Sequence, residues 1–352
     1  MPFAPIDDKG TVLEYEDSGA PPSTDYTTVF LVNAFLWHGG VFRRMFLHAE
    51  KYNMRLIAIH QREYLGSSPF TEDELALLYS DDPEDQAIIL REQAHAIAKV
   101  MAHVISHGNL PLPRQSNNGH TAGGIVVLGR SAGCAHVIAL LGNLDSLDKS
   151  MYALLEQYVR TIIIHDGPSV VYGIPEPAGT HHPLKDITLA PDKVTESFVS
   201  WTTAWHEPFP SLEAVTPEAI IRRKNLSETH DDPKYRPTRM NTEDMKELAC
   251  SGVAERMGPL FVHWGVAKEN TRRALIDTKG LWKNVRVIVE WADMSFWTAA
   301  WAARVLQDLL AEPIREGETR RDVRFVRLEN TNCWVHHEEP ERMLRLIVEQ
   351  TR

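Results

Sequence analysis

The stretch that decides the fold is GGIVVLGRSAGCAHVIALLGNL, residues 123–144. It begins with a short continuous apolar run, which is typical of a strand buried on both faces. It ends, from Cys134 onward, with a helical segment. Between the two lies Gly-Arg-Ser-Ala-Gly, in which Gly129 and Gly133 flank Ser131. A strand, a sharp glycine turn and a helix in this order predict a strained Ser131 whose hydroxyl projects above the sheet.

Similar apolar runs elsewhere in the chain indicate more strands of the same sheet. Between these runs lie segments with apolar residues at helical spacing, such as 85–107 and about 340–350. Strands that alternate with helices predict an α/β fold, a mostly parallel sheet flanked by helices. The predicted strands are Thr28–Val32, Arg55–Ile59, Gly124–Leu128, Val159–Ile164, Val285–Val289 and Val323–Leu328.

The segment 168–283, between two late strands, has a different character. It carries many prolines, few strand-like runs and several helical stripes. A long insertion with its own helices predicts a helical cap or lid over a site. We therefore expect a core formed by residues 1–167 and 284–352, with this cap inserted into it. The alternative is a peripheral decoration with no role at the site.

Length and charge exclude several classes of protein. The chain has 352 residues, enough for one large domain or two ordinary ones, and its net charge is −11. An acidic balance argues against nucleic acid or an anionic membrane as the main partner. The apolar runs are too short to span a bilayer, and the first residues lack a secretory pattern. We expect a cytoplasmic protein whose oligomeric state is open, a homodimer included.

Cofactor and metal signals are missing from the sequence. Neither G-x-G-x-x-G nor G-K-[ST] occurs, so no nucleotide cofactor is expected. The cysteines at 134, 250 and 333 are too widely spaced for a disulfide framework or a zinc cluster. His103 and His107 have i, i+4 spacing without the glutamate of H-E-x-x-H, so no metal is expected there.

Five further segments, in matching order, resemble the α/β-hydrolase superfamily. The resemblance covers most of the chain outside the predicted cap, and it implies a serine nucleophile, an acid, a histidine base and a backbone oxyanion hole. The W-x-D-x-S-x-W and H-H-E-E-P-E pieces are similar to a branch common in fungi. The segments are GTVLEYEDSG at 10–19, VFLVNAFLWHGGVFRR at 29–44, RLIAIHQREYLGSSPF at 55–70, NVRVIVEWADMSFW at 284–297 and LENTNCWVHHEEPERM at 328–343.

The same comparison shows departures at positions that carry chemistry. Cys333 occupies the position of the superfamily's triad histidine, with His336 and His337 nearby. Asn33-Ala34 replaces the superfamily's His-Gly pair, and Glu63 replaces a glycine. Fold positions are kept while catalytic positions have changed, so ordinary ester hydrolysis is in doubt.

The resemblance still assigns roles. Ser131 matches the nucleophile, and the backbone N–H groups of Ala132 and Phe35 match the oxyanion hole, which does not depend on side-chain identity. Asp293 matches the acid, and a solvated loop aspartate is the simpler interpretation of that residue. Weaker alternatives for the acid are Asp166 and Glu290.

The base is the open question. Cys333 could face Ser131, but a thiol with a pKa of about 8.5 is a poor proton shuttle unless a neighbour lowers that pKa. A relocated His336 or His337 is the second possibility, and it requires the loop to shift. The third is a site with no general base for the serine.

The predicted ligand is a bulky and largely apolar small molecule. Asn33 and His38 belong to the loop that carries Phe35, and Trp297 belongs to a set of tryptophans around the cap. We expect an enzyme that acts on an ester, lactone or carbonyl compound, such as a polyketide- or terpenoid-like metabolite, with non-standard base chemistry. A non-hydrolytic lyase, isomerase or cyclase of this fold, and a catalytically silent ligand-binding protein, are the alternatives.

Overall fold

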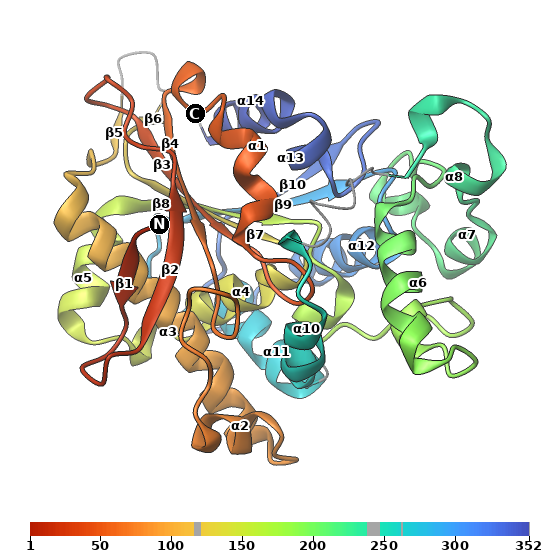
Figure 1. The fold of residues 1–352 in the computed structure, drawn as a ribbon, viewed down its shortest axis with the longest axis horizontal. Coiled ribbons are helices and arrows are strands. Elements are labelled where there is room, and N and C mark those ends of the chain that lie inside the picture. Colours follow the sequence, from red (N-terminus) through yellow and green to blue (C-terminus); the bar gives the residue numbers. More distant parts are fainter. Residues whose placement is uncertain (116–120, 238–246, 262, 352) are drawn as a thin grey trace.

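An eight-stranded sheet, with the strand order β1-β2-β4-β3-β7-β8-β9-β10, forms the centre of the computed structural model (Figure 1). The structure describes residues 1–115, 121–237, 247–261 and 263–351. From β4 to β10 neighbouring strands run parallel, whereas β1 and β2 form an antiparallel edge. The predicted mostly parallel sheet is confirmed.

Each predicted strand is present, with ends that differ by a few residues at most. The apolar runs become fully buried strands in the centre of the sheet because helices cover both faces. The strands are β1 (Phe3–Pro5), β2 (Val12–Asp17), β3 (Thr27–Val32), β4 (Met54–Ile59), β7 (Ile125–Arg130), β8 (Val159–His165), β9 (Arg286–Ala292) and β10 (Val323–Leu328), with a separate short pair, β5 (Arg114–Gln115) and β6 (Thr121–Ala122).

Helices pack on both faces of the sheet, and each face has its own apolar core. α3 (Pro83–Gly108), α4 (Cys134–Gly142), α5 (Lys149–Tyr158) and α12 (Trp297–Ala311) contribute to one core. α1 (Arg43–Phe46), α13 (Val335–Glu338) and α14 (Pro340–Thr351) contribute to the other. The long helix α3 begins where Asp82 accepts a hydrogen bond from the Glu84 N–H, and it ends at the left-handed Asn109.

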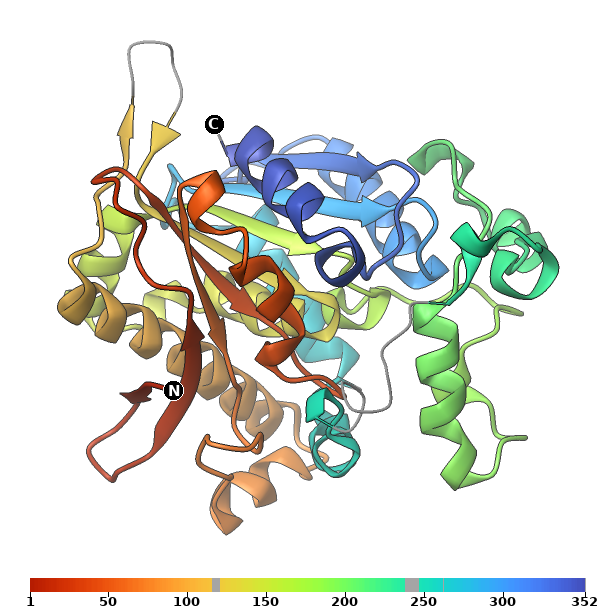
Figure 2. The same cartoon turned by 45° about the horizontal axis from the view of Figure 1, so that its top comes forward.

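The insertion between β8 and β9 is largely helical. Figures 1 and 2 show α6, α7 and α8 beyond the carboxyl ends of the strands, whereas α11 packs against α4 of the core. The described part of the predicted cap therefore includes a segment that joins the core, and the proposed division at 167/168 and 283/284 stays a prediction. The helices are α6 (Pro191–Thr203), α7 (Pro217–Arg222), α8 (Leu226–Thr229), α10 (Ser251–Met257) and α11 (Trp264–Thr271).

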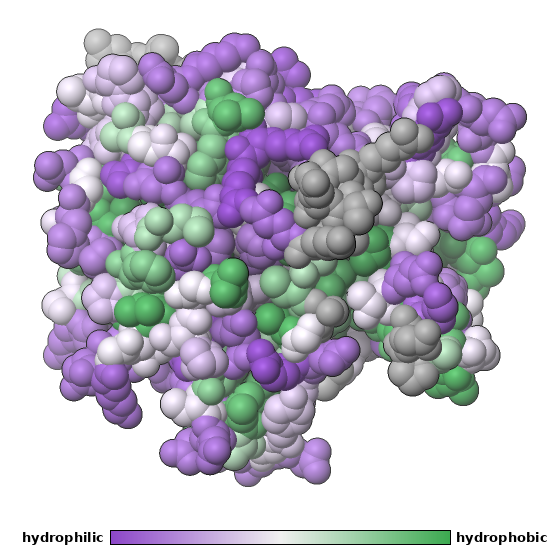
Figure 3. All heavy atoms as spheres, viewed as in Figure 1, coloured by the Kyte–Doolittle hydropathy of each residue, from purple (hydrophilic) through white to green (hydrophobic). Residues whose placement is uncertain are grey.

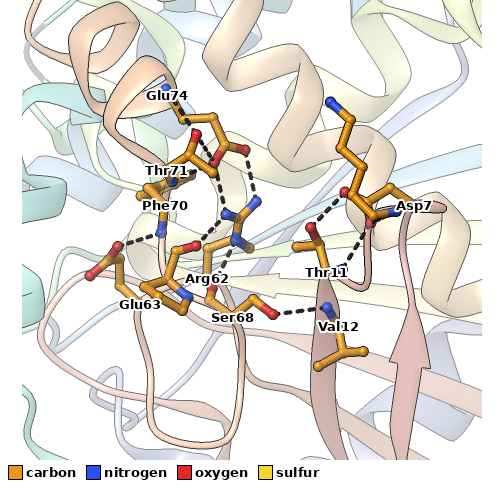
Figure 4. Close-up of polar contacts among 11 residues, drawn as sticks. Asp7, Thr11, Val12, Arg62, Glu63, Ser68, Phe70, Thr71 and Glu74 are labelled. Carbon is orange, nitrogen blue, oxygen red and sulfur yellow. Dashed lines mark hydrogen bonds and ion pairs between the residues drawn. The ribbon is translucent and has the colours of Figure 1, made fainter.

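The loop after β4 carries Glu63 in a backbone conformation that favours glycine (Figure 4). Glu63 has a φ of 74°, and its carboxylate accepts a hydrogen bond of 2.6 Å from the Phe70 N–H. Arg62 donates two bonds of 2.9 Å to Glu74 at the start of α2 (Glu72–Leu78). Side-chain contacts therefore stabilise a left-handed backbone that is unfavourable for a residue with a Cβ.

The surface is mixed in character. On the face shown in Figure 3, apolar residues form several separate groups among polar ones, one of them between the sheet and α6. Among the described residues, no helix is both long enough and apolar enough to cross a membrane.

Candidate active site

Ser131 occupies a tight turn between β7 and α4. Its φ is 50°, the left-handed conformation that side chains rarely adopt. A Cβ at Gly133 would lie 2.3 Å from the Val32 carbonyl oxygen, and one at Gly129 would lie 2.9 Å from Val137 Cγ2. Both positions require glycine because β3 and α4 approach the turn so closely. The expected strand–turn–helix geometry and strained serine are confirmed.

The turn opens into an apolar cavity at the carboxyl edge of the sheet. Its empty volume, mouth included, is about 670 Å³. Helix α6 covers it: Phe198 packs edge-on against Phe35, with ring centroids 5.5 Å apart, and Trp201 packs 5.2 Å from Phe296. The lining residues are Ala34, Phe35, Trp37, Arg130, Ser131, Ala132, Pro168, Val170, His182, Leu184, Phe198, Trp201, Thr202, Phe296, Thr298, Cys333 and Trp334.

Cys333 is among the residues that line this cavity. Its thiol donates a hydrogen bond of 3.3 Å to the Thr202 carbonyl, and the indole N–H of Trp334 donates to the same oxygen at 3.1 Å. Burial raises the pKa of Cys333 to about 12, although the positive charge of Arg130 acts in the opposite direction. The thiol is therefore protonated at neutral pH, and it ties α6 to the floor of the site.

Asp166, directly after β8, is a carboxyl group whose charge acts on this thiol. The residue is fully buried with a φ of 48°, and its carboxylate accepts a hydrogen bond of 2.8 Å from the Ala292 N–H. Burial raises the pKa of Asp166, while the Ser295 hydroxyl lowers the pKa of both Asp166 and Cys333. Asp166 and Cys333 are thus buried groups that influence each other through charge.

Asp293 lies at the end of β9, where its carboxylate has other partners. Arg327 Nη2 donates to it at 2.8 Å, and the Thr331 N–H donates at 3.2 Å. These contacts hold the loops after β9 and β10 together. The role of Asp293 as the acid of a triad stays a prediction.

The histidines after Cys333 lie within the protein core. The ring of His336 packs between Phe42, at 5.2 Å, and Trp334, at 5.5 Å, and burial lowers its pKa well below the usual value. His337 packs edge-on against Trp334. A role for His336 as base stays a prediction, and it would require movement of the loop.

His182 lines the cavity, although it is not among the residues that the sequence assigned to the site. Its ring packs 5.0 Å from Trp201, and its Nδ1 accepts a hydrogen bond from the Leu184 N–H at 3.2 Å. No local motif surrounds His182. Its place within the predicted cap is the only sequence signal that points to the site. Arg130, inside the quoted serine motif, is another lining residue to which the sequence assigned no role.

The loop after β3 carries the predicted oxyanion residue. Phe35 has a φ of 71° and its carbonyl accepts a hydrogen bond of 2.6 Å from the Tyr64 hydroxyl. Asn33 donates to the Trp37 carbonyl at 2.6 Å, which fixes the turn of the loop. Phe35 and Ala132 both line the cavity, so their backbone N–H groups are in the region where an oxyanion hole is expected.

Two other predicted binding residues lie outside the lining of this cavity. His38 is buried, with Nδ1 accepting from the Gly40 N–H at 3.0 Å and Nε2 donating to the Glu247 carbonyl at 2.9 Å. Trp297 lines the neighbouring cavity and donates to the His181 carbonyl at 2.9 Å. Both side chains are engaged with backbone groups, and their predicted contact with a ligand stays untested.

One buried cluster has side chains of the types that bind metals. Ligand atoms of Glu16, His38 and His60 lie within 4.8 Å of one another. The two ring nitrogens of His60 face Glu14 at 3.3 Å and Glu16 at 3.0 Å, and Arg43 Nε donates to Glu16 at 2.7 Å. These groups satisfy one another, and the arginine opposes a further cation.

Solved structures match this chain along nearly its whole length. An esterase from Exiguobacterium antarcticum has a TM-score of 0.54 at 11% identity, covering 99% of this chain and 98% of that one. Bromoperoxidase from Bacillus anthracis has a TM-score of 0.54 at 9% identity and covers 99% of each chain. A thermophilic esterase from Thermogutta terrifontis has a TM-score of 0.50 at 13% identity, covering 99% and 96%.

Sequence comparison adds nothing to this, since no family model matches the chain and the search of curated proteins found no match. Structural likeness at such low identity is evidence about the fold alone. The strand order, the helical insertion after β8 and the strained serine turn after β7 agree with that likeness. This chain has the α/β-hydrolase fold.

Proposed function

We propose that this protein acts on the carbonyl group of a hydrophobic small molecule, an ester or a lactone, with Ser131 as the nucleophile. The observation that carries the proposal is the left-handed Ser131 at the floor of an apolar cavity. The strained turn holds the Ser131 hydroxyl at the cavity surface. The strain lowers the stability of the fold, and it exposes the hydroxyl to a substrate. The esterases among the solved structures support the reaction class.

The reaction follows from the groups around the cavity. Ser131 Oγ attacks the carbonyl carbon and loses its proton, and the backbone N–H groups of Ala132 and Phe35 donate to the oxyanion. The alcohol leaves, an acyl-enzyme forms, and water releases the acid and restores the serine. Phe198 and Trp201 on α6 contact the apolar part of the substrate and exclude water.

The proton from Ser131 needs an acceptor, and Cys333 is the group at the position of the usual histidine. Its thiol is almost entirely protonated at neutral pH, because burial raises its pKa to about 12. Asp166 is a carboxyl group whose charge acts on the thiol. We therefore propose slow acylation at neutral pH, with a rate that rises with pH.

The test is labelling of Ser131 by a fluorophosphonate probe, followed by intact-mass spectrometry. The native protein should gain one adduct, and Ser131→Ala should gain none. Ser169→Ala is a matched control, because Ser169 is a buried serine beside the site that donates to Glu176. Labelling that persists in Ser131→Ala, or no labelling of folded native protein at high pH, would contradict the proposal.

A second candidate is a ligand-binding protein, or an enzyme that rearranges its substrate without using water. The observation that favours it is the Cys333 thiol, which donates to Thr202 instead of accepting a proton. Backbone donors can still polarise a carbonyl when no acyl-enzyme forms. A protein that binds its ligand while Ser131 stays unlabelled would support this candidate. For either function we propose a small-molecule partner and a cytoplasmic location.

A further inference from the structure

Arg130 is a buried cation in the floor of the cavity, next to Ser131. Arg130 is only 2% exposed, and it is one of the residues that line the cavity. Nε donates to the Cys333 carbonyl at 3.2 Å, Nη1 donates to Asn33 Oδ1 at 3.2 Å, and Nη2 lies 3.6 Å from Cys333 Sγ. Among the described residues, Arg130 makes no ion pair with a carboxylate.

These contacts are weak for a buried guanidinium, which has five N–H donors. Two of them are long hydrogen bonds and the third is to sulfur. Arg321 shows what this chain does with a purely structural buried arginine: its donors reach the carbonyls of Ala274, Trp282, Leu281 and Val285 at 2.8 to 3.4 Å. A buried charge is costly unless its donors are well paired, and the hydrogen bonds of Arg130 are fewer and longer than those of Arg321.

The neighbours of Arg130 are the residues at which this chain departs from the superfamily. Asn33 stands in place of a histidine and accepts a hydrogen bond from Nη1. Cys333 stands in place of the triad histidine and contacts both Nε and Nη2. Neither change introduces a negative side chain, so the two substitutions orient the guanidinium without neutralising it. Trp334 supports it from one face, with the ring centroid 4.4 Å from Cζ.

Asp166 acts on Arg130 through its negative charge but makes no ion pair with it. Its carboxylate is bonded to the Ala292 N–H, and burial favours its neutral form. It therefore balances the arginine only in part. Arg130 is among the residues that line the cavity, and most of the other lining residues are apolar.

We propose that Arg130 is the binding site for a carboxylate, and that the ligands of this cavity are hydrophobic molecules with a carboxylate end beside Ser131. A guanidinium matches a carboxylate because two parallel N–H groups can reach its two oxygens. The apolar part of the ligand lies against Phe198 and Trp201 of α6. The assignment rests on the proposed function because it places the reacting carbonyl and the carboxylate in the same cavity.

The experiment is calorimetric titration of the full chain with 4-phenylbutyrate and with its neutral, nearly isosteric amide, 4-phenylbutyramide. In the native protein the acid should bind about 10- to 100-fold more tightly than the amide. In Arg130→Gln the order should reverse, because an ionised carboxylate then enters an apolar cavity without a cation. The amide should bind both proteins with similar affinity, and Arg130→Lys should keep part of the preference.

Equal affinity of the native protein for acid and amide would overturn the assignment, whether or not Arg130→Gln folds. A preference for the acid that survives in folded Arg130→Gln would overturn it as well. Labelling of Ser131 tests the proposed function separately. A protein that prefers the acid but leaves Ser131 unlabelled has the carboxylate site without the nucleophile, and a labelled protein with no such preference has only the nucleophile.

Discussion

Replacing Cys333 with histidine should accelerate acylation of Ser131, because it supplies an imidazole where the chain has a buried thiol. The Cys333 side chain already faces the cavity, so the larger ring has open space to enter. The cost is the thiol's hydrogen bond to the Thr202 carbonyl, which a suitably oriented ring N–H can replace.

The magnitude follows from the two pKa values. With a pKa of about 12, the Cys333 thiol is ionised in about one molecule in 10⁵ at pH 7. An imidazole with a pKa of about 6.5 is about three quarters neutral at that pH, so the population of base rises by roughly 10⁵. The imidazole is a weaker base by about 5.5 units, and a Brønsted slope of about 0.5 reduces the gain roughly 500-fold. A net increase of about 100-fold remains.

The assay is the rate of fluorophosphonate labelling between pH 5 and 10, read by intact mass. Native protein should label faster at each higher pH, since the thiolate is lost as pH falls below its raised pKa. Cys333→His should label fastest above the pKa of the imidazole and reach a plateau near neutrality. Cys333→Ser is the matched control of similar size, and thermal melting checks that each variant is folded.

The reasoning would be refuted by a folded Cys333→His protein that labels no faster than native protein at pH 7. It would equally be refuted by a native profile that already has a plateau near neutrality. That profile would mean that an imidazole, such as His336 or His182, accepts the proton instead of the thiol.

Two further predictions concern stability, both measured by urea unfolding. Gly133→Ala should lower the free energy of unfolding by about 2–3 kcal/mol, because the new Cβ would lie 2.3 Å from the Val32 carbonyl oxygen. The control Gly252→Ala on α10 adds a Cβ that meets no atom within 4 Å, so the free energy of unfolding should change little. Asp293→Asn should lower the free energy of unfolding by about 2 kcal/mol, because it weakens a partly buried pair between Arg327 and the buried Asp293 carboxylate. The control Asp308→Asn weakens only a more exposed pair with Arg304. A stability loss in the controls equal to that in the test variants would contradict both arguments.

Elements whose cause is local could be predicted from the sequence. The apolar run at 124–128 became β7, Ile125–Arg130, because a continuous apolar segment is stable only when both of its faces are covered. Ser131 could be identified because its two glycines and the strand before it are neighbours in the chain. The loop at Glu63 is different. Its backbone is left-handed although the residue is not glycine, and hydrogen bonds of the Glu63 side chain to Phe70 and of Arg62 to Glu74 on α2 stabilise the loop.

The partners of the polar groups could not be predicted in the same way. From the sequence Cys333 was one of three possibilities for the base, and in the fold its thiol donates to the Thr202 carbonyl of α6. Trp297, expected at the ligand, lines the neighbouring cavity, whereas His182 reaches the cavity of Ser131. In each case the side chain is positioned by the insertion, whose packing leaves no periodic signal in the sequence.

The sequence by itself therefore determined the strands, the helices and the strained serine, because these depend on residues close together in the chain. Only the tertiary structure decided the chemistry around that serine. Arg130 and Cys333 are 203 positions apart and meet because β7 and the loop after β10 end at the same edge of the sheet. Burial then raises the pKa of the thiol and leaves the arginine without a carboxylate among the described residues, since the free energy of a charge depends on what surrounds it in space.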